Sequence, residues 1–338
     1  MTIEALAEDA REEILRRDIL PLYFPDSPAD PSPSFVLIAG QPGAGRGRVA
    51  PSLISANDGN MAVLNGEELR AFHPAFNGAS VAYQPDVDAS IAQTVARWVS
   101  ACIRHAREHR RSVALEGTFG NPTAAAGTAQ RFADAGFTTR VMVVGARRAE
   151  SLLSVTSNHL RDVEAGRPTR FTSRDAHDAA LQATRGLVAS LEETAWADRI
   201  TVLGRDGRTV FDAARTDDMT EYRGAGAALL AAQSQRMNRF DATQWLSELH
   251  HVTQFAATAR RLPSGVSELL VDLHVTSLEE VIPQLHVPAQ GKFATAMEQK
   301  TVAALVALRQ TLAAPQPPID IAAPVIAPTA PTRGGPSR

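Results

Sequence analysis

Apolar runs alternate with amphipathic helical stretches through the first two thirds of the chain. Four short runs carry the strand pattern, at residues 35–39, 61–64, 113–115 and 139–144. The stretches that follow them repeat apolar residues at helical spacing, and 88–110 is the longest of these. Regular alternation of strands and helices predicts an α/β fold with a doubly wound, mainly parallel sheet.

The remaining segments differ in pattern. Residues 2–20 predict a helix with one packed face, and a proline-rich stretch leads from it to the first strand. Strand-like runs near 199–203 and 209–211 predict a last strand or a terminal hairpin. Beyond about residue 218 the pattern is almost entirely helical, and the final stretch is rich in proline and alanine. We therefore divide the chain into an N-terminal helix and linker (1–33), an α/β domain (34–217), an appended C-terminal helical region (218–313) and a disordered tail (314–338).

Composition narrows the possible partners. Hydrophobic residues make up 44% and charged residues 21% of the 338 residues, as in ordinary globular proteins. A net charge of −3 and 5% aromatic residues argue against nucleic acid as a partner. The single cysteine, Cys102, excludes an internal disulfide and fits a reducing compartment. No stretch has the apolar length needed to cross a membrane, so we expect a cytoplasmic protein.

A glycine-rich loop follows the first predicted strand. Its spacing is that of the P-loop, G-x-x-x-x-G-K-[ST], with Gly40 and Gly45 in register. Such a loop turns its amide groups toward phosphate oxygens. Two positions depart from the pattern, because Arg46 replaces the lysine and Gly47 replaces the serine or threonine. These residues alone leave open either a phosphate site or a strand–turn–helix packed with small residues.

Acidic residues follow the second and third predicted strands. Glu67 and Glu68 come after the second, and Glu116 comes after the third, followed by Thr118. The carboxyl ends of parallel strands are where open α/β sheets bind their ligands. The alternative is that the two glutamates begin a helix and interact with its dipole. Similarly, the arginine-dense stretch 166–178 suits either a phosphate clamp or an ordinary charged surface.

Four of these segments, in this order, resemble the zeta toxin family. They are Gly-Gln-Pro-Gly-Ala-Gly at 40–45, Leu-Asn-Gly-Glu-Glu-Leu-Arg-Ala-Phe-His-Pro at 64–74, Leu-Glu-Gly-Thr at 115–118, and Arg161 followed by Arg170 and Arg174-x-x-His177-Asp178. The resemblance spans about residues 34–213. It implies a P-loop kinase-like fold and an ATP-dependent kinase that phosphorylates the 3′-hydroxyl of UDP-N-acetylglucosamine or a related nucleotide sugar.

The resemblance also implies roles for particular residues. Glu67 falls where the family has a catalytic aspartate that deprotonates the sugar hydroxyl, and Arg46, Arg161 and Arg170 would act on the transferred phosphate. ATP, with Mg²⁺, would be bound by Gly40, Gln41, Pro42, Gly43, Ala44, Gly45, Arg46 and Gly47. The nucleotide sugar would contact Asn65, Glu116, Thr118 and Thr128. A small helical antitoxin is the partner that the family implies.

The departures from the family pattern favour a second hypothesis. Arginine cannot simply occupy the place of lysine, and Gly47 has no hydroxyl for Mg²⁺. Glu67 in place of aspartate moves the carboxylate by about one C–C bond, which can cost on the order of a hundredfold in rate. The alternative is therefore a weakened or inactive relative that binds nucleotides or nucleotide sugars and has a regulatory or partner-binding role. A dinucleotide-binding loop is a third reading, but its glycines are out of register, because residue 48 is arginine.

Overall fold

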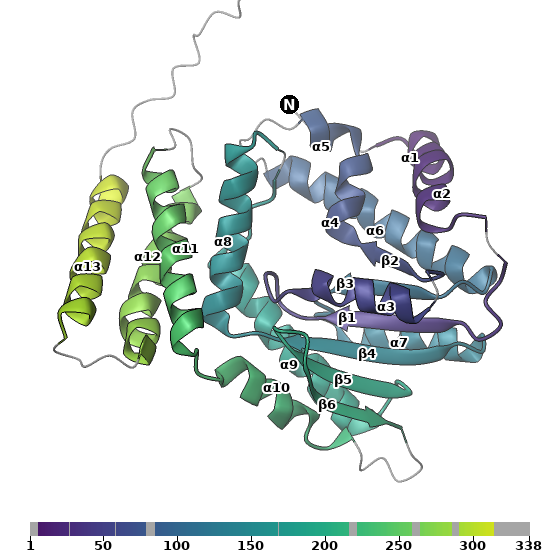
Figure 1. Ribbon diagram of the computed structural model, residues 1–338. Coiled ribbons are helices and arrows are strands. Elements are labelled where there is room, and N and C mark those ends of the chain that lie inside the picture. Colours follow the sequence, from purple (N-terminus) through teal and green to yellow (C-terminus); the bar gives the residue numbers. More distant parts are fainter. Residues whose placement is uncertain are drawn as a thin grey trace, which may run out of the picture.

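The computed structural model describes residues 6–26, 28–57, 59–78, 85–167, 169–215, 222–258, 264–285 and 291–313. The predicted disordered tail, 314–338, lies outside these residues. The described residues form a six-stranded sheet in the order β2-β3-β1-β4-β5-β6 (Figure 1). Its strands are β1 (Ser34–Ala39), β2 (Ala62–Asn65), β3 (Val113–Gly117), β4 (Thr138–Gly145), β5 (Arg199–Gly204) and β6 (Thr209–Ala214).

Five strands run parallel, and β6 pairs antiparallel with β5. The mainly parallel sheet is confirmed, and the last two runs form the terminal hairpin. Register brings the carboxyl ends of the parallel strands to one edge, because Ala39 pairs with Gly117, Asn65 with Glu116, and Gly145 with Gly204. The loops that follow these strands therefore start beside one another, which is the condition for a ligand site at that edge.

Alternation along β1 explains how both faces of the sheet are covered. Phe35 and Leu37 face a core shared with α6, α7 and α9, where Phe35 stacks on Phe132 with ring centroids 4.1 Å apart. Val36 and Ile38 face a smaller cluster that includes α3. A strand buried on both faces is the arrangement expected of a continuous apolar run. The helices are α3 (Ala50–Ala56), α4 (Gly66–Leu69), α5 (Pro74–Gly78), α6 (Pro85–Glu108), α7 (Pro122–Asp134), α8 (Arg148–Glu164) and α9 (Arg174–Thr194).

The N-terminal segment packs onto this core as a helix interrupted by a π turn. It consists of α1 (Glu8–Ile14), the π turn Leu15–Ile19 and α2 (Leu20–Tyr23). Ile19 is fully buried in the main cluster, and the indole of Trp98 donates a hydrogen bond of 3.0 Å to the carbonyl of Arg11. The predicted packed face is thus present.

Helices continue through the C-terminal part, as the pattern predicts. They are α10 (Ala225–Ser234), α11 (Arg239–Thr258), α12 (Ser264–Thr276) and α13 (Lys292–Ala313). α10 packs on the sheet, with Leu229 in the main cluster, whereas α11 and α12 build a second core with α8. Figure 1 shows α11, α12 and α13 standing together beyond α8. The division of the chain into domains stays a prediction. Within the described ranges, no helix has both the length and the apolarity to cross a bilayer.

Candidate active site

The glycine-rich loop, Gly40–Gly47, leaves the carboxyl end of β1 and is fixed against α8. Gly43 and Gly45 have φ angles of +75° and +97°, which side chains rarely allow. A Cβ at Gly43 would lie 2.1 Å from the carbonyl oxygen of Ser151 on α8. Gln41 is fully buried, and its amide nitrogen donates 2.9 Å to the carbonyl of Ala146 and 3.2 Å to the hydroxyl of Ser151. The loop therefore has a defined shape before any ligand binds.

Arg46 points from this loop to the end of β3. Its Nε lies 3.3 Å from Oε1 of Glu116, and only 15% and 9% of the two side chains are exposed. Burial lowers the pKa of Arg46, and Glu116 opposes this shift. Burial raises the pKa of Glu116, and the charge of Arg46 opposes that shift in turn. Nη1 of Arg46 is buried and has no partner among the described residues, so the site has an unused cationic donor beside the loop.

Gly47 leaves open space next to Arg46. A Cβ there would meet no atom within 4 Å. The position therefore has no hydroxyl, and no other group fills the space that a serine or threonine side chain would take. The described residues contain no cluster of three or more histidine, cysteine, aspartate or glutamate side chains suited to a metal ion. The side chains of this described part of the chain therefore do not form a metal cage.

Glu67 and Arg170 meet across the mouth of the site. Asn65 caps α4 by accepting 2.9 Å from the amide of Glu67, which fixes the start of that short helix. Nη1 of Arg170, from the loop between α8 and α9, lies 3.1 Å from Oε1 of Glu67. Arg70 is 3.9 Å from the same carboxylate and also pairs with Asp88. An acid after β2 and an arginine about a hundred positions later are thus brought into contact.

Register also brings the start of α4, with Glu67, to the edge from which the glycine loop leaves β1, because Asn65 pairs with Glu116 and the adjacent Gly117 pairs with Ala39. The predicted residues Arg46, Glu67, Glu116 and Arg170 therefore form one group at the carboxyl edge of the sheet. This group combines carboxylates with cations whose guanidinium groups suit phosphate oxygens.

The other predicted residues take different positions. Arg161 pairs with Glu248 of α11 at 2.6 Å, and no ion pair among the described residues joins it to Glu67 or Arg170. Thr128 donates 2.9 Å to the carbonyl of Ala124 within α7. Thr118 is partly buried in the loop after β3. Their predicted roles in phosphate and substrate binding remain predictions.

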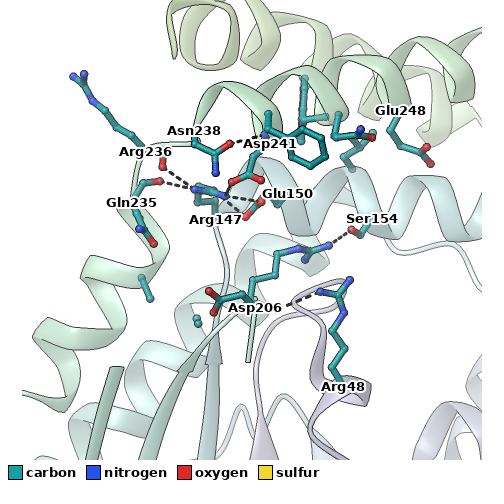
Figure 2. A pocket seen from close by; sticks show the side chains of 18 of the residues that line it. Arg48, Arg147, Glu150, Ser154, Asp206, Gln235, Arg236, Asn238, Asp241 and Glu248 are labelled. Carbon is teal, nitrogen blue, oxygen red and sulfur yellow. Dashed lines mark hydrogen bonds and ion pairs between the residues drawn. The ribbon is translucent and has the colours of Figure 1, made fainter. Parts of the chain in front are cut away.

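A polar pocket of about 760 Å³ adjoins the glycine loop on the side of the β5–β6 turn. Figure 2 shows Arg147 beside Glu150 and Asp241, with Arg48 on the wall nearer the loop. Nη1 of Arg205 lies 2.5 Å from the carbonyl oxygen of Gly43, which ties the pocket to the loop. Six arginines line this pocket: Arg48, Arg147, Arg161, Arg205, Arg208 and Arg236.

Sequence reasoning missed Arg48 and Arg205. A signal was available, since Arg205 follows directly on β5 and stands at the same carboxyl edge as Glu67 and Glu116. Burial lowers the pKa of Arg205, and Glu150 opposes the shift. A partly desolvated arginine beside a phosphate-type loop is a candidate ligand contact.

Comparisons with known proteins agree on one family. The zeta toxin family model matches residues 23–216. The toxin zeta of Enterococcus hirae is 24% identical over 191 residues, covering 56% of this chain and 66% of that protein. The toxin PezT of Streptococcus pneumoniae is 23% identical over 182 residues, covering 53% and 72%. The match thus spans just under two thirds of the length of the Enterococcus toxin.

A solved structure from the PezAT chromosomal toxin–antitoxin system of Streptococcus pneumoniae has the same fold. It superposes with a TM-score of 0.63 at 17% identity, over 75% of this chain and 99% of that chain. The family match covers more than half of the sequence and includes the glycine loop, Glu67, Glu116 and Arg170. The sheet, the loop and the family match lead to one conclusion: the chain belongs to the zeta toxin family.

Proposed function

We propose that this protein is an ATP-dependent kinase that phosphorylates the 3′-hydroxyl of UDP-N-acetylglucosamine or a related nucleotide sugar. The observation that carries the proposal is the contact between Glu67 and Arg170, 3.1 Å apart, at the sheet edge from which the glycine loop leaves. Phosphoryl transfer depends on positioning, a base and cations more than on covalent chemistry, and these residues provide each of them.

The residues around the loop fit a triphosphate. The glycine loop presents backbone amides at the carboxyl end of β1, and Nη1 of Arg46 is a buried donor that none of the described residues satisfies. A phosphate oxygen would satisfy that donor. ATP supplies the γ-phosphoryl group that is transferred.

The fit to Mg²⁺ is poorer, because position 47 has no hydroxyl and the described residues hold no carboxylate cluster. A magnesium ion that accompanies ATP would therefore depend on phosphate oxygens and water for its ligands.

The proposed reaction assigns a step to each residue at the mouth of the site. Glu67 accepts the proton of the sugar hydroxyl. The hydroxyl oxygen bonds to the γ-phosphorus as the β–γ phosphoanhydride bond breaks, and ADP leaves. Arg170, already beside Glu67, neutralises the charge of the phosphoryl group. Arg46 stabilises the phosphate that remains on the nucleotide. Arg161 joins this group only if its pair with Glu248 opens.

The test is incubation with ATP, Mg²⁺ and UDP-N-acetylglucosamine, followed by mass spectrometry for a product that is one phosphate heavier. Glu67→Gln should abolish the product, because the amide cannot accept the proton. Glu68→Gln is the matched control, since Glu68 is the adjacent glutamate of α4 and contacts Tyr23 instead. No product from the wild-type protein, and none after Glu67→Asp, Arg46→Lys and Gly47→Thr are combined, would refute the kinase.

The Arg46–Glu116 pair and the bare Gly47 favour one alternative, a relative that binds nucleotides or nucleotide sugars without turnover and acts through regulation or a partner. Calorimetry distinguishes the two. Tight binding of UDP-N-acetylglucosamine or ATP with no phosphorylated product supports the alternative, and sustained turnover excludes it.

We further propose that the chain is the toxin of a toxin–antitoxin pair with a small helical antitoxin. Support comes from the fold that it shares with a protein of the PezAT toxin–antitoxin system. Induced expression in bacteria should arrest growth, and Glu67→Gln should relieve the arrest at equal protein level. Arrest that is equal for both proteins would separate toxicity from the proposed chemistry.

A further inference from the structure

A chain of buried polar side chains joins the glycine loop to α9, and the proposed reaction gives it no role. Gln41 donates 3.2 Å to Oγ of Ser151, which lies 2.8 Å from Nε2 of His177. Nδ1 of His177 lies 3.0 Å from Oδ1 of Asp178. The residues Gln41, Ser151 and His177 are all fully buried.

The same chain continues to the C-terminal helices. Arg148 binds both carboxylate oxygens of Asp178 at 2.9 Å, and its Nη2 lies 3.0 Å from Asp272 on α12. These three side chains are 33%, 37% and 24% exposed, so solvent screens the outer contacts. We therefore expect the buried inner contacts, between Gln41, Ser151 and His177, to connect the glycine loop to α9 more strongly than the outer contacts connect α9 to α12.

Each hydrogen bond from Gln41 through Ser151 and His177 to Asp178 has its donor on the side of Gln41. Burial lowers the pKa of His177, and Asp178 opposes this only in part, so the ring is neutral. The neutral ring donates from Nδ1 to Asp178 and accepts at Nε2 from the Ser151 hydroxyl, for which the carbonyls of Arg147 and Arg148, at 3.1 and 3.2 Å, are the longer alternatives. Oγ of Ser151 in turn accepts from Gln41. Serine, histidine and aspartate in this order resemble a nucleophile with its base. Full burial of Ser151 excludes that chemistry, because no substrate can reach its hydroxyl.

Ser151 also contacts the crest of the glycine loop. Its carbonyl oxygen lies so near Gly43 that a Cβ on that glycine would be only 2.1 Å from it. One helical turn nearer the middle of α8, Oγ of Ser154 lies 2.6 Å from Arg205, which also donates to the carbonyl of Gly43. Side chain and backbone of α8 thus hold the loop at two nearby positions, Gln41 and Gly43.

We propose that Ser151 and His177 are positioning residues that hold the glycine loop on α8 in the shape that receives a phosphate chain, with Asp272 supporting them from α12. A loop that is already in its bound shape loses less conformational freedom on binding, which strengthens affinity without adding a contact. This inference rests on the proposed function only in naming the phosphate chain as the ligand of the loop.

Hydrogen–deuterium exchange in the free, full-length protein measures the loop directly. Ser151→Ala removes the acceptor for Gln41, and amides of residues 40–49 should exchange about two- to tenfold faster, the range expected for one buried hydrogen bond. ADP affinity, measured by calorimetry, should weaken by a similar factor. Thr156→Val is the matched control, because this buried hydroxyl of α8 donates to the carbonyl of Leu152 in its own helix and to no other group in the described part of the chain.

Two substitutions of His177 separate positioning from mere packing. Glutamine reaches the place of Nε2 and can still accept the Ser151 hydroxyl, whereas asparagine reaches only the place of Nδ1 and loses that contact. His177→Asn should therefore speed exchange of the loop as Ser151→Ala does, and His177→Gln should keep it near the wild-type rate. Asp272→Asn should change the exchange rate of the loop less than twofold, because the contact between Arg148 and Asp272 is partly exposed.

Unchanged loop exchange in both Ser151→Ala and His177→Asn overturns the inference, as do equal rates for His177→Gln and His177→Asn. Failure of the proposed function is seen separately, as absence of a phosphorylated product when the wild-type protein is incubated with ATP, Mg²⁺ and UDP-N-acetylglucosamine. The exchange rates decide the positioning role in either case.

Discussion

The buried pair of Arg46 and Glu116 allows a sharp test, because it stands where the P-loop pattern is broken. Arg46→Met keeps much of the side-chain volume and leaves the Glu116 carboxylate without its partner, 3.3 Å away in the native protein. Breaking a buried ion pair by removing one partner costs about 3–5 kcal/mol. Glu116 keeps 9% exposure and can take up a proton, so we expect a loss of about 2–4 kcal/mol in the free energy of unfolding at pH 7.

The dependence on pH has a definite sign. Burial raises the pKa of Glu116 above its ordinary 4.5, and loss of Arg46 removes the opposing charge, so the folded-state pKa rises further. A group whose pKa is higher in the folded state stabilises below its unfolded pKa and loses that contribution as pH rises. The loss in the free energy of unfolding caused by Arg46→Met should therefore be small near pH 4.5 and grow toward pH 8.

Urea denaturation of wild type, Arg46→Met, Glu116→Gln and the double variant completes a double-mutant cycle. Both charges are desolvated, so removing both should leave the double variant within about 1 kcal/mol of wild type. A coupling energy below about 0.5 kcal/mol, or a deficit of Arg46→Met that shrinks as pH rises, would refute the buried pair. ATP affinity should fall about tenfold or more in Arg46→Met, because the unpaired Nη1 is lost.

Three further predictions concern the loop and the cores. Gly43→Ala should destabilise by at least about 2 kcal/mol and abolish nucleotide binding, because its Cβ would lie 2.1 Å from a carbonyl oxygen of α8. Gly47→Ala, with open space around it, should change stability by less than about 0.5 kcal/mol, and equal losses in the two would contradict the loop geometry. Burial lowers the pKa of His177 below its ordinary 6.5, so stability should fall as pH drops below 6.5. His177→Gln should flatten that decline in urea titrations, and an unchanged slope would mean that the ring is not held neutral. A chain ending after residue 217 should aggregate on expression, because it exposes the apolar faces that α8 and the sheet present to α10, α11 and α12, and a soluble, cooperatively unfolding product would show that these helices are dispensable.

Most of the fold follows from local patterns. Apolar runs at 35–39 and 139–144 are buried on both faces, and such runs are typical of inner parallel strands. Element ends differ from the predicted ones, as with α6, which begins at Pro85 where the pattern predicts residue 88, and α1, which begins at Glu8 where it predicts residue 2. Those ends depend on caps and tertiary contacts that periodicity does not record.

The candidate site was predictable in part. Glu67 and Glu116 follow strands, and parallel strands that share an edge must bring their carboxyl ends together. Arg170 lies in a loop whose path no local rule specifies, and its contact with Glu67 depends on how α8 and α9 pack. Arg161 shows the limit most clearly, because its partner, Glu248, lies on a helix 87 positions away.

The sequence by itself determined the strands, the helices and the glycine loop, since each depends on residues a few positions apart. The tertiary structure decided what those parts contact. Arg46 meets Glu116, Ser151 meets both Gln41 and His177, and α11 lines the arginine-rich pocket, because the packing of the sheet and α8 brings these segments together. Contacts between segments far apart in the chain arise from packing of the whole core, and spacing along the sequence carries no record of them.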